Sequence, residues 1–512
     1  MIINMLKNKS QLKIGALITY FTIGFNIIAG LIYTPWMIDQ IGQNDYGLYT
    51  LANSLIALFL MDFGLSSATA RYVAKYKAEN KHEELNKFLN IVYRLYIAID
   101  AAIFVVLILV FFFIDTIYQN LTPDELAKFK VIYCIASLYS IISFPCVTFN
   151  GILNAYEEFL PLKTADLLQK VCSILFTVIA LSFGMGLYAL VAANALSGLF
   201  AISIKFYYVR RNTKIKNIKI NSQEKKSIFS DVFKFSLWST IWALSQRLIF
   251  NITPTLLGIV VVNAAAAISV FGIITTIEGY FYIITTAING MFLSRITRLM
   301  NKDKNGEELT SLATIVGRFQ YALNGLLVVG FAFIGKDFIS LWVGQEFIDA
   351  YIGILLIVIP GIFYNALQII HTAIVVQNLV KYQAFIQITI GVINVICSLI
   401  LSYFFGVIGA SISISVAYFL RLILTFVLVK KKMKFNFKSF INNCYFKMSI
   451  PIIISLVLIF VINPFISSST WLMLAIKMLI IVVIYLLSVF AFGISNNEKR
   501  KLFSKIISKI KK

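Results

Sequence analysis

Ionisable residues inside long apolar runs are the first candidates for chemistry in this sequence, because such residues are costly in hydrocarbon and by default functional. Arg247 lies 15 residues before Val262, and Glu278 lies 16 residues after it. On neighbouring antiparallel helices, the two would sit at similar depth. We expect either a structural ion pair, or a site in which the planar guanidinium of Arg247 binds an anionic group through two hydrogen bonds and Glu278 exchanges its ionic partner.

Further polar residues accompany this pair. Tyr280 follows Glu278 closely and is a further candidate for substrate binding. Asp100 lies six residues after Arg94 and is expected either to couple transport to a cation or to pack as a polar group. Glu278 is the other candidate for ion coupling.

A second carboxylate, Asp62, is expected to form a cytoplasmic gate contact near Arg71 or Arg94. Three other basic residues stand within reach of a membrane surface and are expected to extend their charged ends toward it: Lys205, Arg421 and Lys477.

Composition places these residues in a membrane. The chain has 512 residues, of which 59% are apolar and 13% charged, and its mean hydropathy is +0.86. Soluble domains are roughly 45–50% apolar and about 25% charged, so a soluble or disordered chain is excluded. The apolar runs are continuous rather than alternating, which excludes β-barrel strands. With roughly 20 residues per span, we expect an all-α integral membrane protein of about 14 helices.

Charge sets the expected orientation. Of the 45 Lys and Arg residues, 39 fall on the side of the N-terminus, and only Lys128, Lys130 and Lys336 fall on the other. The positive-inside rule then predicts a multi-pass protein of a bacterial cytoplasmic (inner) membrane, with both termini in the cytoplasm. The basic segments Arg210–Lys226 and Lys499–Lys512 are expected to face anionic membrane lipids, so no nucleic acid is expected as a partner.

The sequence repeats with an offset of about 219 residues. Three kinds of local feature recur in this register: Thr34–Pro35 with Thr253–Pro254, Pro145 and Asn150 with Pro360 and Asn365, and the turn before Gly186 with the turn before Gly406. We expect the duplicated Pro and Asn residues to mark hinges. The repeats predict two parallel six-helix lobes, residues 1–225 and 226–440, followed by a helix pair and basic tail, residues 441–512.

Three motifs give the chain a recognisable relationship: Ile41–Tyr49 (IGQNDYGLY), Met61–Ser67 (MDFGLSS) and Arg71–Ala74 (RYVA). Together with the repeats they resemble the polysaccharide-exporter branch of the multidrug/oligosaccharidyl-lipid/polysaccharide exporter superfamily, specifically O-antigen or capsule repeat-unit flippases of the Wzx type. This resemblance implies a protein that moves an undecaprenyl-diphosphate-linked oligosaccharide to the outer leaflet, in company with a polysaccharide polymerase and glycosyltransferases.

The physics of that task agrees with the sequence. Two negative charges that move outward across an inside-negative potential gain roughly 4–5 kcal/mol per 100 mV, and a proton or sodium ion is the expected coupling ion. No nucleotide-binding loop and no metal-ligand spacing among the five cysteines is found, so we expect no cofactor and no metal.

Three alternatives stay open. Within the superfamily, these are a cation-coupled multidrug exporter and a peptidoglycan-precursor flippase. The remote alternative is a membrane polysaccharide polymerase or glycosyltransferase. Its catalytic residues would need a long outer loop, and the longest one here, 336–350, has acidic residues at no obvious acid/base spacing. We therefore expect a transporter and no enzyme.

Overall fold

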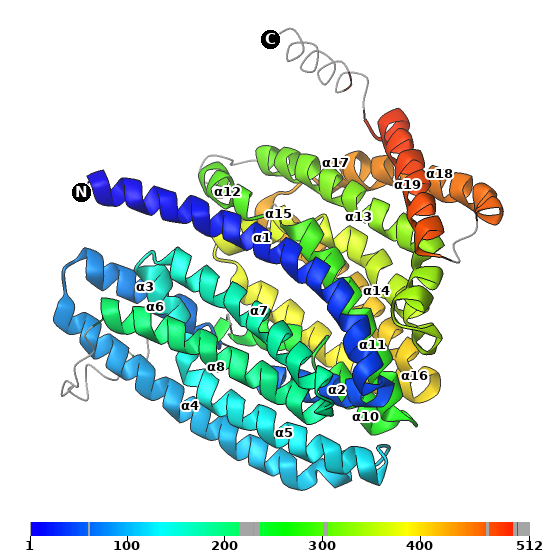
Figure 1. Cartoon of the computed structure of the whole chain (residues 1–512). Coiled ribbons are helices and arrows are strands. Elements are labelled where there is room, and N and C mark those ends of the chain that lie inside the picture. Colours follow the sequence, from blue (N-terminus) through cyan, green and yellow to red (C-terminus); the bar gives the residue numbers. More distant parts are fainter. Residues whose placement is uncertain are drawn as a thin grey trace. The chain divides into compact units, whose positions relative to one another are not determined.

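The chain is described by a computed structural model that covers residues 2–59, 62–213, 229, 236–238, 240–287, 289–300, 306–466, 470–494 and 499. Within these ranges every regular element is a helix (Figure 1). The expected all-α membrane fold is confirmed. The basic segments Arg210–Lys226 and Lys499–Lys512 lie largely outside the described residues, so the predicted contact with anionic lipids stays a prediction.

The helices of the first part of the chain are α1 (Ile2–Ile41), α2 (Gln43–Phe59), α3 (Leu65–Ala78), α4 (His82–Ile117), α5 (Pro123–Ser143), the 3₁₀ turn η1 (Phe144–Val147), α6 (Thr148–Ala155), α7 (Phe159–Ser182) and α8 (Gly186–Asn212). Residues 240–247 are also helical.

The remaining elements are α10 (Thr253–Val260), α11 (Ala264–Thr286), η2 (Asn289–Phe292), α12 (Leu293–Met300), α13 (Glu307–Trp342), η3 (Gln345–Phe347), α14 (Ala350–Asn365), α15 (Gln368–Val376), α16 (Val380–Met433), α17 (Phe437–Phe440), η4 (Ile441–Phe446), α18 (Lys447–Ile462), η5 (Asn463–Phe465), α19 (Trp471–Ser488) and η6 (Val489–Gly493).

Ten of the described helices are long and apolar enough to cross a membrane, or eleven if the bent pair α14–α15 is one span. The expected number of about 14 is not confirmed. One reason is that α16 runs for 54 residues through a non-helical Gly406, where φ is 57° and ψ is −135°. Another is that α2 has only 17 residues, fewer than the roughly 20 that a span needs.

Left-handed turn residues recur at nearly constant separation in the two halves of the chain. This conformation is costly for residues with a Cβ, and Gly and Asn adopt it most readily. The pairs are Gly42 and Asn263 (φ 83° and 56°), Glu157 and Asn378 (both 59°), and Gly186 and Gly406 (67° and 57°). Their separations of 220 to 221 residues follow the register of the sequence repeat. The lobe boundaries at 225 and 440 stay a prediction.

The two duplicated prolines lie at or shortly before a helix break. Proline lacks the N–H that continues the helix, and its ring clashes with the preceding turn. Pro145 lies in η1, between the end of α5 and the start of α6. Pro360 lies in α14, which is bent by 52° from α15 at the break that follows it. The breaks recur as the register predicts, and their action as hinges stays a prediction.

Contacts divide the chain into two compact units. The first unit is Met1–Gly272 with Gln387–Ala410, and the second is Ile273–Ile386 with Ser411–Lys512. In the first unit, α7 packs against α1 and α8, and α5 packs against α2 and α8. In the second, α13 packs against α14, α18 and α19. The helices around α7 and α5 therefore form the framework for the site described next.

Candidate functional site

The first unit contains a polar cavity of about 490 Å³, a size typical of small-molecule sites. Three charged residues line it: Asp166, Lys170 and Arg247. Uncharged hydrogen-bonding side chains make up most of the rest: Asn26, Tyr49, Asn53, Tyr139, Gln169, Ser173, Asn194 and Ser197. The cavity therefore combines charge with many donors and acceptors among helices that are apolar enough to cross a membrane, where ionisable residues are by default functional.

Helix α7 supplies one polar face to the cavity. Asp166, Gln169, Lys170 and Ser173 follow the spacing i, i+3, i+4, i+7, which places them on one side of a helix. This pattern was the available signal in the sequence. None of these four residues was predicted as a site residue from the sequence, although all four line the cavity.

Lys170 and Arg247 bring uncompensated positive charge to the cavity. Lys170 forms no hydrogen bond or ion pair with another residue in the described part of the chain. Arg247 has five N–H donors, and its described acceptor is Asn251, whose Oδ1 lies 3.2 Å from Nη1. Both cations therefore keep donors for a ligand. The sequence had singled out Arg247 as a substrate-binding residue, and the structure places it in the cavity wall.

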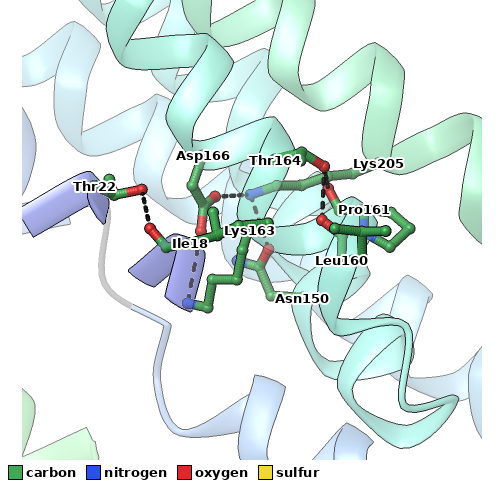
Figure 2. Close-up of polar contacts among 9 residues, drawn as sticks. All are labelled: Ile18, Thr22, Asn150, Leu160, Pro161, Lys163, Thr164, Asp166 and Lys205. Atoms are coloured by element: carbon green, nitrogen blue, oxygen red, sulfur yellow. Dashed lines mark hydrogen bonds and ion pairs between the residues drawn. The ribbon is translucent and has the colours of Figure 1, made fainter. Parts of the chain in front are cut away.

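Asp166 is the negative group of the cavity, and Lys205 balances it. Figure 2 shows Lys205 Nζ between two acceptors, Asp166 Oδ1 at 2.7 Å and Asn150 Oδ1 at 3.1 Å. Lys163 lies 3.8 Å from the other carboxylate oxygen of Asp166. Only 12% of the Lys205 side chain is exposed. The expectation that Lys205 extends to the membrane surface is wrong, because α7 packs against α8 and presents a carboxylate to it.

Amide and hydroxyl groups of three helices are joined in the cavity wall. Asn194 on α8 donates its Nδ2 to Tyr49 Oη on α2 at 3.0 Å and accepts from Ser173 Oγ on α7. Tyr139 lies so close to Gly198 that a Cβ there would collide with its hydroxyl. Position 198 therefore needs glycine to let the Tyr139 ring lie against α8.

A second polar cluster lies within the second unit, where Tyr418 Oη donates to Glu278 Oε1 at 3.0 Å. The Arg421 guanidinium lies 4.9 Å from the ring centre of Tyr364 and 5.7 Å from that of Tyr418. Arg421 is 4% exposed, so its expected extension to the surface is also wrong. The aromatic faces and the carboxylate of Glu278 offer it partners inside the unit.

Lys477 departs from its expectation in the same way. Its residue is 4% exposed, and its Nζ lies 3.9 Å from Asp337 Oδ2. Because α19 packs against α13, the lysine finds a carboxylate within the unit and does not extend to a surface.

The structure does not decide the other predicted roles. Arg247 lies in the first unit, while Glu278 and Tyr280 lie on α11 in the second, so their joint site and the pairing of Arg247 with Glu278 stay predictions. Asp100 is 9% exposed, and its Oδ1 has no hydrogen-bond partner among the described residues. Its coupling role is likewise untested.

Asp62 is engaged at the start of α3. Its Oδ1 accepts from the Ser66 backbone N–H at 3.0 Å and from Tyr96 Oη at 3.1 Å. Arg71 and Arg94 are both exposed. The predicted gate contact of Asp62 with an arginine is therefore not among its described hydrogen bonds, and the gate itself stays a prediction.

No three His, Cys, Asp or Glu side chains gather in a group suited to a metal ion in the parts of the chain that the structure covers.

Solved structures with this fold are transporters and flippases. A structure titled lipid II flippase MurJ in an inward closed conformation matches with a TM-score of 0.72 and 15% identity, covering 94% of this chain and 98% of that one. An inward-facing multidrug resistance MATE family transporter of the MOP superfamily matches with a TM-score of 0.66 and 13% identity, covering 81% and 98%. The eukaryotic MATE transporter AtDTX14 matches with a TM-score of 0.57 and 15% identity, covering 86% and 99%. At these identities the likeness concerns the fold alone.

The family profile described as polysaccharide biosynthesis protein matches residues 12–294. Because this range is more than half of the chain, the protein belongs to the polysaccharide biosynthesis protein family. The expected relationship to the polysaccharide-exporter branch is confirmed. None of the curated proteins matches the sequence significantly.

Proposed function

We propose that the protein moves an undecaprenyl-diphosphate-linked oligosaccharide from the cytoplasmic to the outer leaflet of a bacterial cytoplasmic membrane by alternating access. Both termini then lie in the cytoplasm, as the charge distribution predicts. The observation that carries the proposal is the presence of Lys170 and Arg247 in one cavity whose wall is otherwise rich in amides and hydroxyls.

The charges of the cavity suit a diphosphate. Asp166 alone would repel an anion, but Lys205 at 2.7 Å balances its charge, so Lys170 and Arg247 remain as net positive groups. A guanidinium can donate two parallel hydrogen bonds to one phosphate, and an ammonium acts as a compact charge for the other. The diphosphate would thus find counter-charges at a depth where hydrocarbon offers none.

The uncharged lining suits a sugar. Asn26, Asn53, Gln169 and Asn194 offer both donors and acceptors, which match the hydroxyl groups of an oligosaccharide. Each polar group without a partner costs several kcal/mol in the hydrocarbon region, and this cavity would lower that barrier. A proton or sodium ion, with Glu278 and Asp100 as the coupling carboxylates, is the proposed companion of the step.

A depletion experiment tests the proposal. Cells depleted of the protein should accumulate a lipid-linked oligosaccharide in the cytoplasmic leaflet and fail to display the finished polymer. Restoration of wild-type protein, but not of Arg247→Gln, should reverse both effects. Continued polymer display, with only drug sensitivity altered, would contradict the proposal and favour a multidrug exporter, since a multidrug resistance transporter has the same fold.

The second candidate is transport of a peptidoglycan precursor. The match to a structure titled lipid II flippase, over 94% of this chain, favours it, and that cargo also carries a diphosphate. The same depletion separates the two, because the lipid that accumulates would then be the peptidoglycan precursor and cell-wall synthesis would stop.

A further inference from the structure

A second cavity, of about 440 Å³, lies within the first unit. It is bounded by residues of α3, α4, α6 and α8, and it reaches the C-terminal turn of α8. Most of its lining is apolar or aromatic, and the full set is Thr69, Leu89, Asn90, Val92, Tyr93, Thr148, Phe149, Ile152, Phe206, Val209, Arg210 and Thr213. Such a space suits an apolar chain, and Arg210 at the end of α8 adds a positive charge.

Two polar groups of the cavity have no described partner. Thr69 is fully buried, and its Oγ1 has no hydrogen-bond partner among the described residues. Arg210 is exposed and forms no ion pair with another residue in the described part of the chain. A buried hydroxyl without a partner is unfavourable unless a ligand or water supplies one, so the cavity has features of a site for an amphipathic ligand.

We propose that this cavity binds one acyl chain and the phosphate of an anionic glycerophospholipid from the cytoplasmic leaflet. The apolar lining contacts the acyl chain, and the guanidinium group of Arg210 binds the phosphate. Arg210 belongs to the side of the chain that carries 39 of the 45 basic residues, the side on which anionic headgroups attract Lys and Arg. The charge of Arg210 and its position thus both favour an anionic glycerophospholipid as the ligand.

Lipid in this cavity would act on the substrate cavity through the contact of α6 with α8. Phe149 and Phe206 line the lipid cavity, with ring centres 5.8 Å apart. The adjacent residues of the same two helices, Asn150 and Lys205, form the 3.1 Å hydrogen bond beside Asp166 (Figure 2). A chain packed on the two rings therefore supports the helix contact that holds Lys205 against Asp166.

Native mass spectrometry of the purified full-length protein tests the site. Phosphatidylglycerol should remain bound to the wild type, and phosphatidylcholine should not compete with it. Arg210→Gln should weaken phosphatidylglycerol binding about tenfold, the loss expected for one charge-assisted contact. Arg211→Gln is the matched control, since it removes the same charge from the next residue, which does not line the cavity. It should bind as the wild type does.

Val92→Phe is a second test variant. It fills the apolar part of the cavity and should reduce phosphatidylglycerol binding although Arg210 is intact. The melting temperature of each variant shows whether it is folded. Equal weakening by the two arginine variants would overturn the proposal, since it would indicate a general surface charge effect. Preference for undecaprenyl phosphate over phosphatidylglycerol would also overturn it and assign the cavity to the carrier lipid. Lipid binding is measured without transport, so this outcome is independent of the proposed function.

Discussion

Lys205 Nζ lies 2.7 Å from Asp166 Oδ1 and joins α8 to α7 beside the polar cavity that Asp166 lines. Asn150, on the short helix that follows the break at Pro145, accepts from the same ammonium at 3.1 Å. One lysine thus connects the cavity to the broken helix. Any movement of α6 at this break acts directly on the charge balance of the cavity.

The ion pair predicts a difference between single and double substitutions. Lys205→Met leaves the Asp166 carboxylate with only the more distant Lys163, 3.8 Å away. It should destabilise the protein by about 1–3 kcal/mol, less than for a fully buried pair because Asp166 is partly exposed. Lys205→Met combined with Asp166→Leu should recover most of that stability. Thermal unfolding in detergent measures both. A double variant less stable than the single one would show that the pair is not the source of the effect.

Lys170 should contribute to transport, whereas its neighbour on the same helix should not. Lys170→Gln removes one of the two cations without a balancing carboxylate and should reduce transport about tenfold, equivalent to about 1.4 kcal/mol of binding. Lys163→Gln removes the same charge from a residue outside the cavity lining and serves as the control. Lys163 lies 3.8 Å from Asp166, and in this variant Lys205 still balances that carboxylate at 2.7 Å. Transport of a fluorescent lipid-linked oligosaccharide into the outer leaflet of proteoliposomes measures the difference. Equal activity of the two variants would exclude Lys170 from the site.

Arg247 should bind cargo rather than only pair with Glu278. If the pair is structural, Arg247→Leu with Glu278→Leu should be tolerated, because apolar packing often replaces a buried pair. We expect instead that the double variant and Arg247→Leu alone both lose transport with near-normal expression; the single variant keeps Glu278, the proposed coupling carboxylate. Arg247→Lys, which keeps the charge without the planar guanidinium, should retain partial activity. Full activity of the double variant would mean that the cargo site lies elsewhere.

Gly198 should determine the position of the Tyr139 ring. Gly198→Ala places a Cβ against the Tyr139 hydroxyl, so the ring must shift and transport should fall. Adding Tyr139→Leu should restore folding stability by removing the collision. Gly24→Ala is the control, since a Cβ at Gly24 meets no atom within 4 Å. Unchanged transport and stability in Gly198→Ala would contradict the packing described here.

The hydroxyl group of Tyr418, in the polar cluster of the second unit, should contribute to the stability of the protein. Tyr418→Phe removes the donor to Glu278 Oε1 and should lower the free energy of unfolding by about 1 kcal/mol, the usual net worth of such a bond. Tyr403→Phe, at a residue that is 70% exposed, should change it little. Denaturation in the same detergent measures the free energy of unfolding of both variants. Equal decreases would show that the hydrogen bond from Tyr418 to Glu278 does not cause the effect.

The amino-acid sequence alone determined the class of fold and the places where helices break. Hydropathy over some twenty residues is a local property, and it predicts membrane helices without any knowledge of their neighbours. Proline and glycine act on their own backbone, so the breaks at Pro145 and Pro360 and the turns at Gly186 and Gly406 were predictable. The sequence also identified Arg247 as a charge that needs an explanation.

Tertiary structure decided which polar groups meet. Lys205 and Asp166 are 39 residues apart in the sequence. The position of a residue along its own helix does not reveal whether another helix packs against the face that carries it. For the same reason the sequence did not identify Lys170 as a cavity residue, and it predicted that Arg421 and Lys477 extend to a surface, although Arg421 and Lys477 are each 4% exposed. The energy of a charge in a membrane depends on its partners, and only the packing of α7 against α8, and of α19 against α13, supplies them.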